Sequence, residues 1–216
     1  MLNLRSYLII GCGHFGSQAI TKLLRKDPRS KIIVVDKNKK ALQKISHLPV
    51  EPIFSDGTLY LNSFLSEGCK MDYIIPAGPF HLAFEFILSQ LKPLGAKRRK
   101  VPPLPRLPNP KKGKTGDLYT SIANFLCPEN CPEPSSSCTV TGERRPKPLY
   151  QLLKELSGPF ESKVIRSQQL ERGVGGFKVK VLLDMMGDIK ERRSSGRLIL
   201  ISTASRCHGV TSALSF

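Results

Sequence analysis

The sequence predicts an α/β protein whose first part is a doubly wound parallel sheet. Two observations carry this prediction. Apolar, strand-like runs and helix-compatible stretches alternate four times within the first 96 residues, as is typical of a parallel sheet with helices on its faces. The first of these runs, residues 7–10, leads directly into three glycines spaced G-x-G-x-x-G. We therefore expect a nucleotide-binding turn at the start of the sheet.

The glycine turn occupies residues 11–16, Gly-Cys-Gly-His-Phe-Gly. Gly11 allows the tight turn, Gly13 lets the backbone approach a pyrophosphate, and Gly16 lets the next helix pack close to the strand. That helix directs its free N–H groups and its positive dipole end toward the phosphates. The next apolar strand ends at Asp36, about 20 residues beyond the last glycine, where a carboxylate can accept both ribose hydroxyls. This order predicts a dinucleotide site, and the alternative is a glycine-rich turn in some other α/β protein.

The remaining elements of the first part follow in regular order. A helix over residues 17–25 ends at an Asp-Pro pair, and the strand of residues 31–36 comes next. We expect a short basic helix over 37–45, a strand over 50–54, and a helix that opens at Asp56 and stops at Gly68. A fourth strand over 72–77 and a helix over 80–91 complete the alternation.

The character of the chain changes after residue 96. Residues 97–100 are basic and residues 101–110 are rich in proline, so residues 97–116 are expected to be an extended linker or a clamp across a surface. Residues 117–216 then form a cysteine-containing α/β region. Its expected elements are helices over 146–156 and 177–193, strands over 163–166 and 197–204, and a polar exit over 205–212. These late strands either extend the first sheet or form a smaller second domain, and we favour the second arrangement.

Three cysteines lie within twelve residues in this region, at Cys127, Cys131 and Cys138. Thiolates on a proline-stiffened loop can converge on one ion or cluster, so we expect zinc or an iron–sulfur cluster here. Cys207 is the expected fourth ligand, with His208 as the other candidate. The spacing matches neither common zinc fingers nor bacterial ferredoxins, and the alternative is a loop of reduced thiols.

The composition places the chain among globular proteins. Its 216 residues include 40% apolar residues, enough for a core. No run approaches the roughly 20 apolar residues of a membrane span, so we expect a cytoplasmic protein in which the six cysteines are reduced or bind metal. Cys12, inside the glycine turn, and Cys69, near a helix end, are expected to be packing residues.

The charge is strongly basic, with a net +17, of which +5 falls up to residue 96 and +12 after it. Such a surface favours anionic partners. The sequence has no recognition-helix pattern and no basic-aromatic stacking platform, which argues against nucleic acid and for solvated charge with general polyanion affinity. A further set of polar residues near the C-terminus is expected either to bind an anion or substrate or to form a loop without a ligand. These residues are Arg206, His208, Thr211 and Ser212.

The first 95 or so residues resemble the TrkA-N, or RCK, domains that regulate potassium uptake systems and potassium channels. The likeness rests on the glycine turn, on Val34-Val35-Asp36 and on the turn at residues 55–58. It implies NAD or NADH as ligand, with the glycines on the diphosphate, Asp36 on the adenosine ribose and Asp56 near the adenine. Asp36 argues for NAD over NADP, whereas the lysines from Lys37 onward weaken that preference.

The resemblance also implies partners, namely a second copy of the chain and a membrane potassium transporter. The residues expected to contact the dinucleotide are Gly11, Gly13, His14, Phe15, Gly16, Asp36, Lys37 and Asp56. For His14 the favoured alternative is a residue of the first helical turn that faces solvent. The chain departs from the family at Ser55, where glycine is usual, and at Pro76 in the fourth strand. The ligand-sensing second domain usual in the family is not recognisable.

Three functions follow from these features. The first is an NAD-binding regulator of the potassium-uptake type. The second is an NAD-dependent oxidoreductase whose cysteine loop holds zinc or an iron–sulfur cluster, and the third is a redox or metal sensor. No catalytic constellation is recognisable, which disfavours dehydrogenase chemistry without deciding whether the protein is an enzyme.

Overall fold

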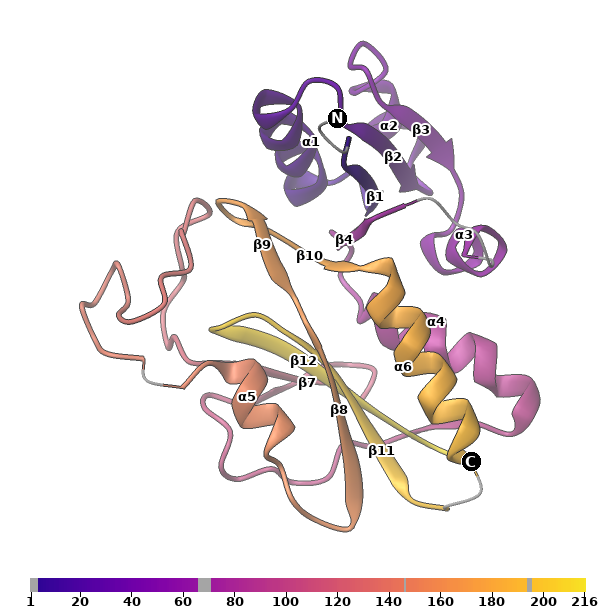
Figure 1. The fold of residues 1–216 in the computed structure, drawn as a ribbon, viewed down its shortest axis with the longest axis vertical. Coiled ribbons are helices and arrows are strands. Elements are labelled where there is room, and N and C mark those ends of the chain that lie inside the picture. Colours follow the sequence, from indigo (N-terminus) through magenta and orange to yellow (C-terminus); the bar gives the residue numbers. More distant parts are fainter. Residues whose placement is uncertain (1–3, 66–70, 146, 194–195) are drawn as a thin grey trace.

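The computed structural model describes residues 4–65, 71–145, 147–193 and 196–216. These residues form two six-membered sheets, and the helices lie around and between them (Figure 1). The strand order in the first sheet is β3-β2-β1-β4-β10-β9. The second sheet has the order β6-β7-β12-β11-β8, and β5 pairs with β12 beside this path. The fold is therefore mixed α/β, as the sequence predicts.

Four parallel strands form one side of the first sheet, and a helix follows each of them. The strands are β1 (Ser6–Ile10), β2 (Lys31–Asp36), β3 (Glu51–Phe54) and β4 (Tyr73–Pro76). The helices are α1 (His14–Lys26), α2 (Lys39–Gln43), α3 (Gly57–Phe64) and α4 (Leu82–Leu91). Because β1 and β2 are buried on both faces, they read as continuous apolar runs, which explains why the sequence located them correctly.

Two later strands extend this sheet in the antiparallel direction. They are β9 (Gln168–Glu171) and β10 (Val174–Lys178), and β10 pairs with β4 through Phe177 and Ile74. The expected helix over 177–193 is shorter, since α6 spans Val179–Glu191. Gly176 permits this pairing, because a Cβ there would lie 2.8 Å from the carbonyl oxygen of Ile74. The late part of the chain thus contributes strands to both sheets.

The second sheet contains the other strands of the chain. They are β5 (Lys97–Arg99), β6 (Lys111–Lys112), β7 (Leu118–Ser121), β8 (Phe160–Arg166), β11 (Leu198–Ala204) and β12 (His208–Ser215). The 3₁₀ helix η1 (Lys92–Leu94) precedes β5, and α5 (Leu149–Lys154) precedes β8. Residues 97–99 of the segment expected as a linker are therefore a strand. The domain boundaries at residues 96 and 116 remain predictions.

The expectation of a polar exit over residues 205–212 was wrong for its second half, which belongs to β12. Polar residues are buried in this strand because their hydroxyl groups find partners inside the protein. Thr211 shares a hydrogen bond of 2.8 Å with Ser202 of β11, and Ser212 donates to Asp117. A hydroxyl group that is hydrogen-bonded can be buried at little cost, so a buried strand could have a polar sequence here and was not recognised.

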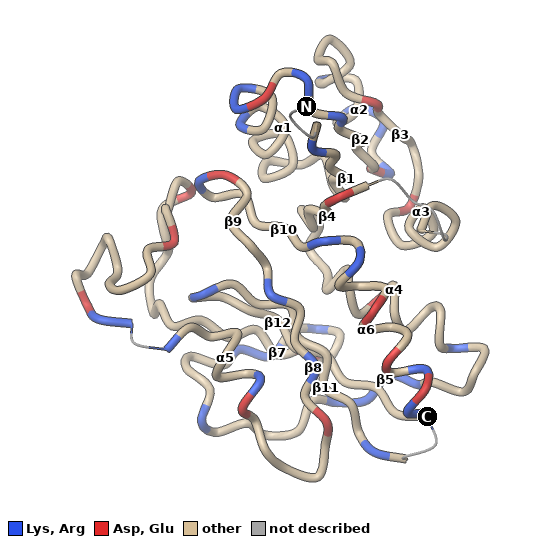
Figure 2. Tube along the Cα trace, viewed as in Figure 1, with Lys and Arg blue, Asp and Glu red and all other residues tan. Residues whose placement is uncertain are grey.

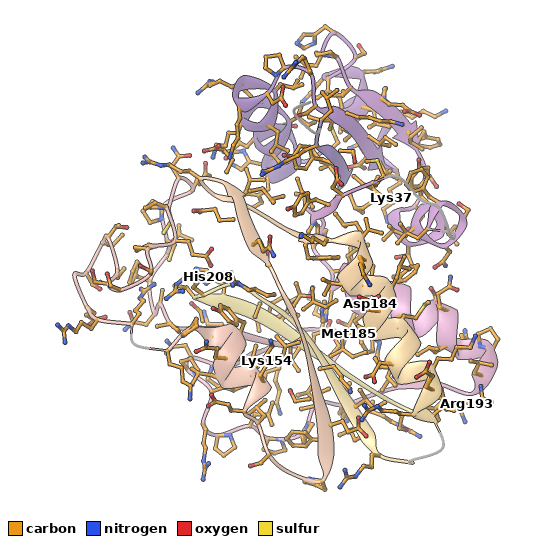
Figure 3. The ribbon with its side chains drawn as sticks, viewed as in Figure 1. Lys37, Lys154, Asp184, Met185, Arg193 and His208 are labelled. Carbon is orange, nitrogen blue, oxygen red and sulfur yellow. The ribbon has the colours of Figure 1, made fainter. Side chains whose placement is uncertain are left out.

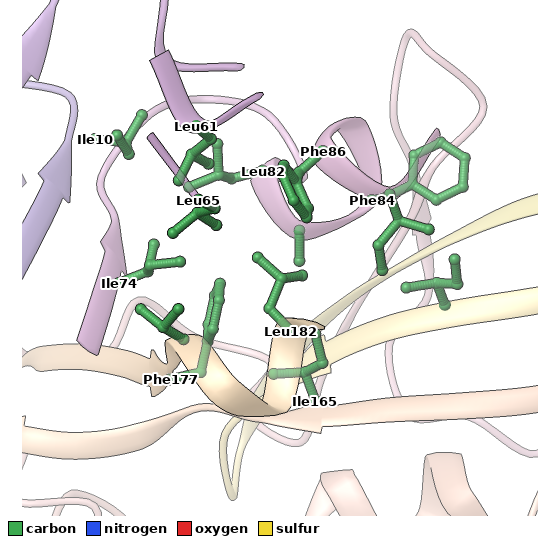
Figure 4. Packing of buried hydrophobic residues seen from close by; sticks show 14 of the residues in the cluster. Ile10, Leu61, Leu65, Ile74, Leu82, Phe84, Phe86, Ile165, Phe177 and Leu182 are labelled. Carbon is green, nitrogen blue, oxygen red and sulfur yellow. The ribbon is translucent and has the colours of Figure 1, made fainter. Parts of the chain in front are cut away.

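One hydrophobic cluster connects the two sheets. Helices α4 and α6 lie side by side between them (Figure 1), and the cluster joins Phe86 of α4 and Leu182 of α6 to Ile74 of the first sheet and Ile165 of the second (Figure 4). Phe177 also lies in this cluster with 1% of its surface exposed. Burial of large apolar side chains from both sheets in one core fixes their relative position.

Lysine and arginine are spread over both sheets and their loops, with acidic residues among them (Figure 2). None of the helices in the described part of the chain has the length and the apolar composition needed to cross a membrane.

Candidate functional site

The glycine turn combines two closely packed glycines with one open glycine. Gly11 has a φ of +105° and donates its N–H to Val35 at 2.8 Å. A Cβ on Gly16 would lie 1.9 Å from the carbonyl oxygen of Gly11, so helix and turn are in direct contact. Gly13 differs, because a Cβ there would meet no atom within 4 Å. Gly13 is also the N-cap of α1 and provides no side-chain cap. The backbone is thus accessible at the point where a phosphate would approach.

Asp36 lies at the end of β2 beside this turn. Its Oδ2 accepts a hydrogen bond from the N–H of Cys12 at 2.5 Å, and its Oδ1 accepts one from Asn38 at 2.7 Å. These contacts fix the carboxylate against the ends of β1 and β2. Because an ionised carboxylate offers about four lone-pair sites, two of them remain for other donors. The position suits the ribose role expected from the sequence.

The other expected cofactor residues lie around this turn in differing environments. Asp56 caps α3, since its Oδ1 accepts from Thr58 at 2.9 Å and from Leu59 at 3.1 Å. Lys37 is exposed beside the end of β2 (Figure 3), and Phe15 is 62% exposed. The turn therefore offers a carboxylate, an ammonium group and an aromatic ring around open backbone.

A basic groove of about 830 Å³ runs beside the turn, between α1 and α2. Its lining includes Gly13 and Asn38 together with four cationic side chains and no carboxylate. The cationic residues are Lys22, Arg25, Lys40 and Lys44. The groove adds positive potential next to the uncapped end of α1, which favours an anion there.

The loop that carries the cysteines lies against the first turns of α1. Glu129 accepts hydrogen bonds from His14 Nε2 at 2.8 Å and from Gln18 Nε2 at 2.5 Å. Lys22 donates to the side chain of Asn130 at 2.7 Å. The bonds from Gln18 and His14 lower the pKa of Glu129. Sequence reasoning missed Glu129, because no local pattern links it to a helix more than a hundred residues away.

The described residues do not support the metal centre expected at the cysteines. Among residues 4–65, 71–145, 147–193 and 196–216, no group of three or more His, Cys, Asp or Glu side chains could hold a metal ion. Cys207, the expected fourth ligand, instead accepts a hydrogen bond from Nη1 of Arg145 at 2.7 Å. A guanidinium beside this sulfur disfavours a cation at the same place. Cys127, Cys131 and Cys138 are free thiols, and zinc or an iron–sulfur cluster is not supported.

The thiols differ in environment. Burial raises the pKa of Cys207 and that of Cys127. Backbone hydrogen bonds from the turn at Thr141 lower the pKa of Cys138. Cys12 is 3% exposed, which confirms it as a packing residue. Cys69 lies outside the described residues.

A buried polar network joins the start of α4 to the second sheet. His81 is 2% exposed, with Nδ1 at 2.8 Å from Ser212 Oγ and Nε2 at 3.0 Å from Thr203 Oγ1. Ser212 also donates to Asp117, which pairs with Arg98 at 3.0 Å. Burial lowers the pKa of His81 to about 3. Of the C-terminal residues expected to bind an anion, Ser212 and Thr211 are therefore occupied by structural hydrogen bonds.

His208 and Arg206 are the other two residues of that expected set. His208 stands at the start of β12 (Figure 3), and its Nδ1 lies 3.0 Å from Ser121 Oγ. Burial lowers the pKa of His208. Arg206 donates its side chain to the carbonyl of Ser135 and its backbone N–H to Glu133 at 2.5 Å. Arg206 is thus engaged in holding the cysteine loop.

Comparisons with known proteins match two separate stretches of the chain. Residues 7–60 match the TrkA-N domain, which confirms the resemblance found in the sequence. Residues 83–216 match the AF_1314_C family, described as "Uncharacterized protein, C-terminal domain". An uncharacterized protein of Archaeoglobus fulgidus is 29% identical over 221 residues, covering 96% of this chain and 98% of that protein. The similarity to this relative therefore spans both parts.

Proposed function

From the premise that the chain belongs to the AF_1314_C family and opens with a TrkA-N domain, we propose that it is a regulatory protein that binds NAD or NADH. The observation that carries the proposal is the open backbone at Gly13, next to the uncapped start of α1 and 23 residues before the fixed carboxylate of Asp36. Dinucleotides are held at two points: a helix N-terminus binds the diphosphate, and a carboxylate at a strand end binds the ribose.

In this proposal each residue of the turn has a separate role. The backbone of Gly13 and the first N–H groups of α1 would hold the diphosphate. The remaining lone pairs of Asp36 would accept hydrogen bonds from the hydroxyls of the adenosine ribose, and Lys37 and Asp56 would lie on the adenine side. When bound, the dinucleotide would serve either as a carrier of hydride or as a ligand whose presence is the signal. The charge of Asp36 would repel a 2′-phosphate, which favours NADH over NADPH.

The regulatory part of the proposal rests on the contact between α1 and the cysteine loop. Glu129 is bonded to His14 and Gln18, two residues at the start of the helix that would hold the diphosphate. A bound diphosphate brings negative charge beside this carboxylate and competes for the His14 ring. We infer that the bound cofactor weakens loop docking and so transmits its presence to the second sheet.

A second copy of the chain and a membrane potassium transporter are the partners that the TrkA-N likeness suggests for such a signal, and we retain both as proposals. We also propose the cytoplasm as the compartment, because the five cysteines that the structure describes are free thiols, as suits a reducing environment.

A thiol-based redox sensor or an NAD-dependent oxidoreductase is the second candidate function. The observation that favours it is a cavity that Phe15 of the glycine turn shares with Cys127, Cys131 and Cys207. Thiols that line a cavity next to a nicotinamide cofactor would be placed to respond to its redox state.

Titration calorimetry with NADH and NADPH tests the proposed function. Asp36→Asn removes the charge and keeps one acceptor oxygen for the N–H of Cys12, but it loses the bond from the N–H of Asn38. Thermal unfolding of the variant therefore checks that the protein remains folded. We expect wild-type protein to prefer NADH, and Asp36→Asn to weaken NADH binding by about 1–3 kcal/mol. Glu51→Gln, an exposed acid on β3, is the matched control and should bind as wild type does. Equal affinity for both cofactors, unchanged by Asp36→Asn, would contradict the ribose assignment.

A further inference from the structure

A large cavity lies between the cysteine loop, the second sheet and the edge of the first sheet. Its volume is about 1060 Å³, enough for a small organic molecule. The walls come from β7, the turn before β12, the β9–β10 hairpin and Phe15 of α1. Part of the lining is apolar, including Phe15, Phe125, Leu126 and Val174.

Arg145 is the buried cation in this lining. It is 7% exposed, and its backbone N–H donates to Ser136 at 2.8 Å, which holds the residue in place. Of its side-chain nitrogens, Nη1 donates to the sulfur of Cys207. Nε is buried and has no hydrogen-bond partner, and no bond from Nη2 is found within the described residues. One edge of the guanidinium is thus unused.

The positive charge of Arg145 also lacks a paired carboxylate. No acidic group in the described ranges lies within 4 Å of it, and the two glutamates of the cavity are engaged elsewhere. Glu129 is bonded to His14 and Gln18, and Glu133 accepts from the backbone of Arg206. A buried charge and a buried N–H without partners are both costly.

We propose that this cavity binds a small organic anion, whose oxyanion group accepts hydrogen bonds from the free Nε–Nη2 edge of Arg145. The planar edge of a guanidinium matches the two oxygens of a carboxylate or phosphate, and such bonds are stronger than neutral ones. The apolar body of the ligand lies against Phe125 and Val174, and it covers the exposed side chains of Leu126 and Phe15. Ser121, Gln169 and His208 provide polar contacts at the same wall.

The proposal does not rest on dinucleotide binding, because the residue that binds the anion, Arg145, lies in the AF_1314_C part of the chain. It therefore survives if the glycine turn binds no cofactor. The site would give the second sheet its own small-molecule ligand, next to the loop that contacts α1.

The test uses benzoate and inorganic phosphate as probes on the full chain without added nucleotide. Thermal unfolding is followed against sodium chloride of equal ionic strength, and affinity is measured by calorimetry. Arg145→Met removes the guanidinium at similar length, and Arg144→Met is the matched control, since it changes the same charge on an exposed neighbour. We expect at least one probe to stabilise wild type and Arg144→Met, and Arg145→Met to weaken its binding at least about tenfold. If only benzoate stabilises the protein, the ligand is a carboxylate with an apolar body. If only phosphate does, the ligand carries a phosphate group.

A second measurement covers the case in which Arg145→Met fails to fold. Proton–nitrogen spectra of wild-type arginine side chains should show one protected Nε–H signal that shifts on addition of the active probe. Equal stabilisation of all three proteins, or no response of wild type to either probe, would overturn the proposal. Either result would mean that Arg145 only holds Cys207 and the cysteine loop in place.

Discussion

The buried imidazole of His81 makes the stability of this protein fall with falling pH in a predictable range. In the folded state desolvation holds the pKa of His81 at about 3, against 6.5 for an unperturbed histidine. The ring is enclosed by Ser212, Thr203 and the stacked ring of Phe84, with Asp117 and Arg98 as the nearest charges. In the unfolded chain, His81 therefore binds a proton below about pH 6.5, whereas in the folded protein it binds one only below about pH 3.

The sign and size of the effect follow from this difference. Because the unfolded state binds more protons between these two values, the free energy of unfolding decreases as the pH falls through that range. For one such group the loss between pH 7 and pH 5 is about 2 kcal/mol. The lowered pKa of Asp117 acts in the same direction but below 3.8, outside this interval. Burial of His208 also acts in the same direction, so the variant comparison must isolate His81.

Urea unfolding of wild type and His81→Gln at pH 7 and pH 5 measures the effect. Glutamine keeps a donor and an acceptor for Thr203 and Ser212 but does not titrate. We expect wild type to lose about 2 kcal/mol more than the variant between the two pH values. If both proteins lose the same amount, the buried neutral histidine is not the cause, and the reasoning is refuted.

Two further predictions concern the cysteine loop. Glu129→Gln removes the charge that faces His14, so we expect faster proteolysis within residues 127–138 and tighter NADH binding. An unchanged cleavage rate together with an unchanged affinity would show that the loop is not coupled to α1. Protein purified without oxygen is expected to carry less than one equivalent of zinc or iron and to unfold at the same temperature with and without a chelator, because Cys207 contacts Arg145; a stoichiometric metal whose removal destabilises the loop would restore the cysteine site.

The sequence predicted the first four strands, the glycine turn and Asp36 because each is encoded by neighbouring residues. A parallel strand buried on both faces leaves an apolar run, and a close approach of helix and strand requires glycine at positions such as Gly11 and Gly16. The TrkA-N match at residues 7–60 falls on this locally encoded stretch.

The features that the sequence did not reveal depend on contacts between distant segments. β10 joins β4 across about a hundred residues, and nothing near Val174 signals which sheet edge it will meet. Glu129 and Arg145 acquire their roles only when the loop folds over α1 and Cys207. The clustered cysteines suggested a metal, but their spacing could not show that a guanidinium would face the fourth sulfur. Tertiary electrostatics, rather than local propensity, decides these positions.

The central claim is that the chain binds NADH at the glycine turn, and titration of Gly13→Val with NADH tests it most directly. A Cβ at Gly13 would meet no protein atom within 4 Å, so the variant should unfold at the temperature of the wild type while blocking the approach of the diphosphate. Gly187→Val, at an equally open glycine in α6, is the matched control. The account predicts that NADH binding is lost in Gly13→Val and retained in Gly187→Val. Wild-type affinity in a folded Gly13→Val protein would contradict it.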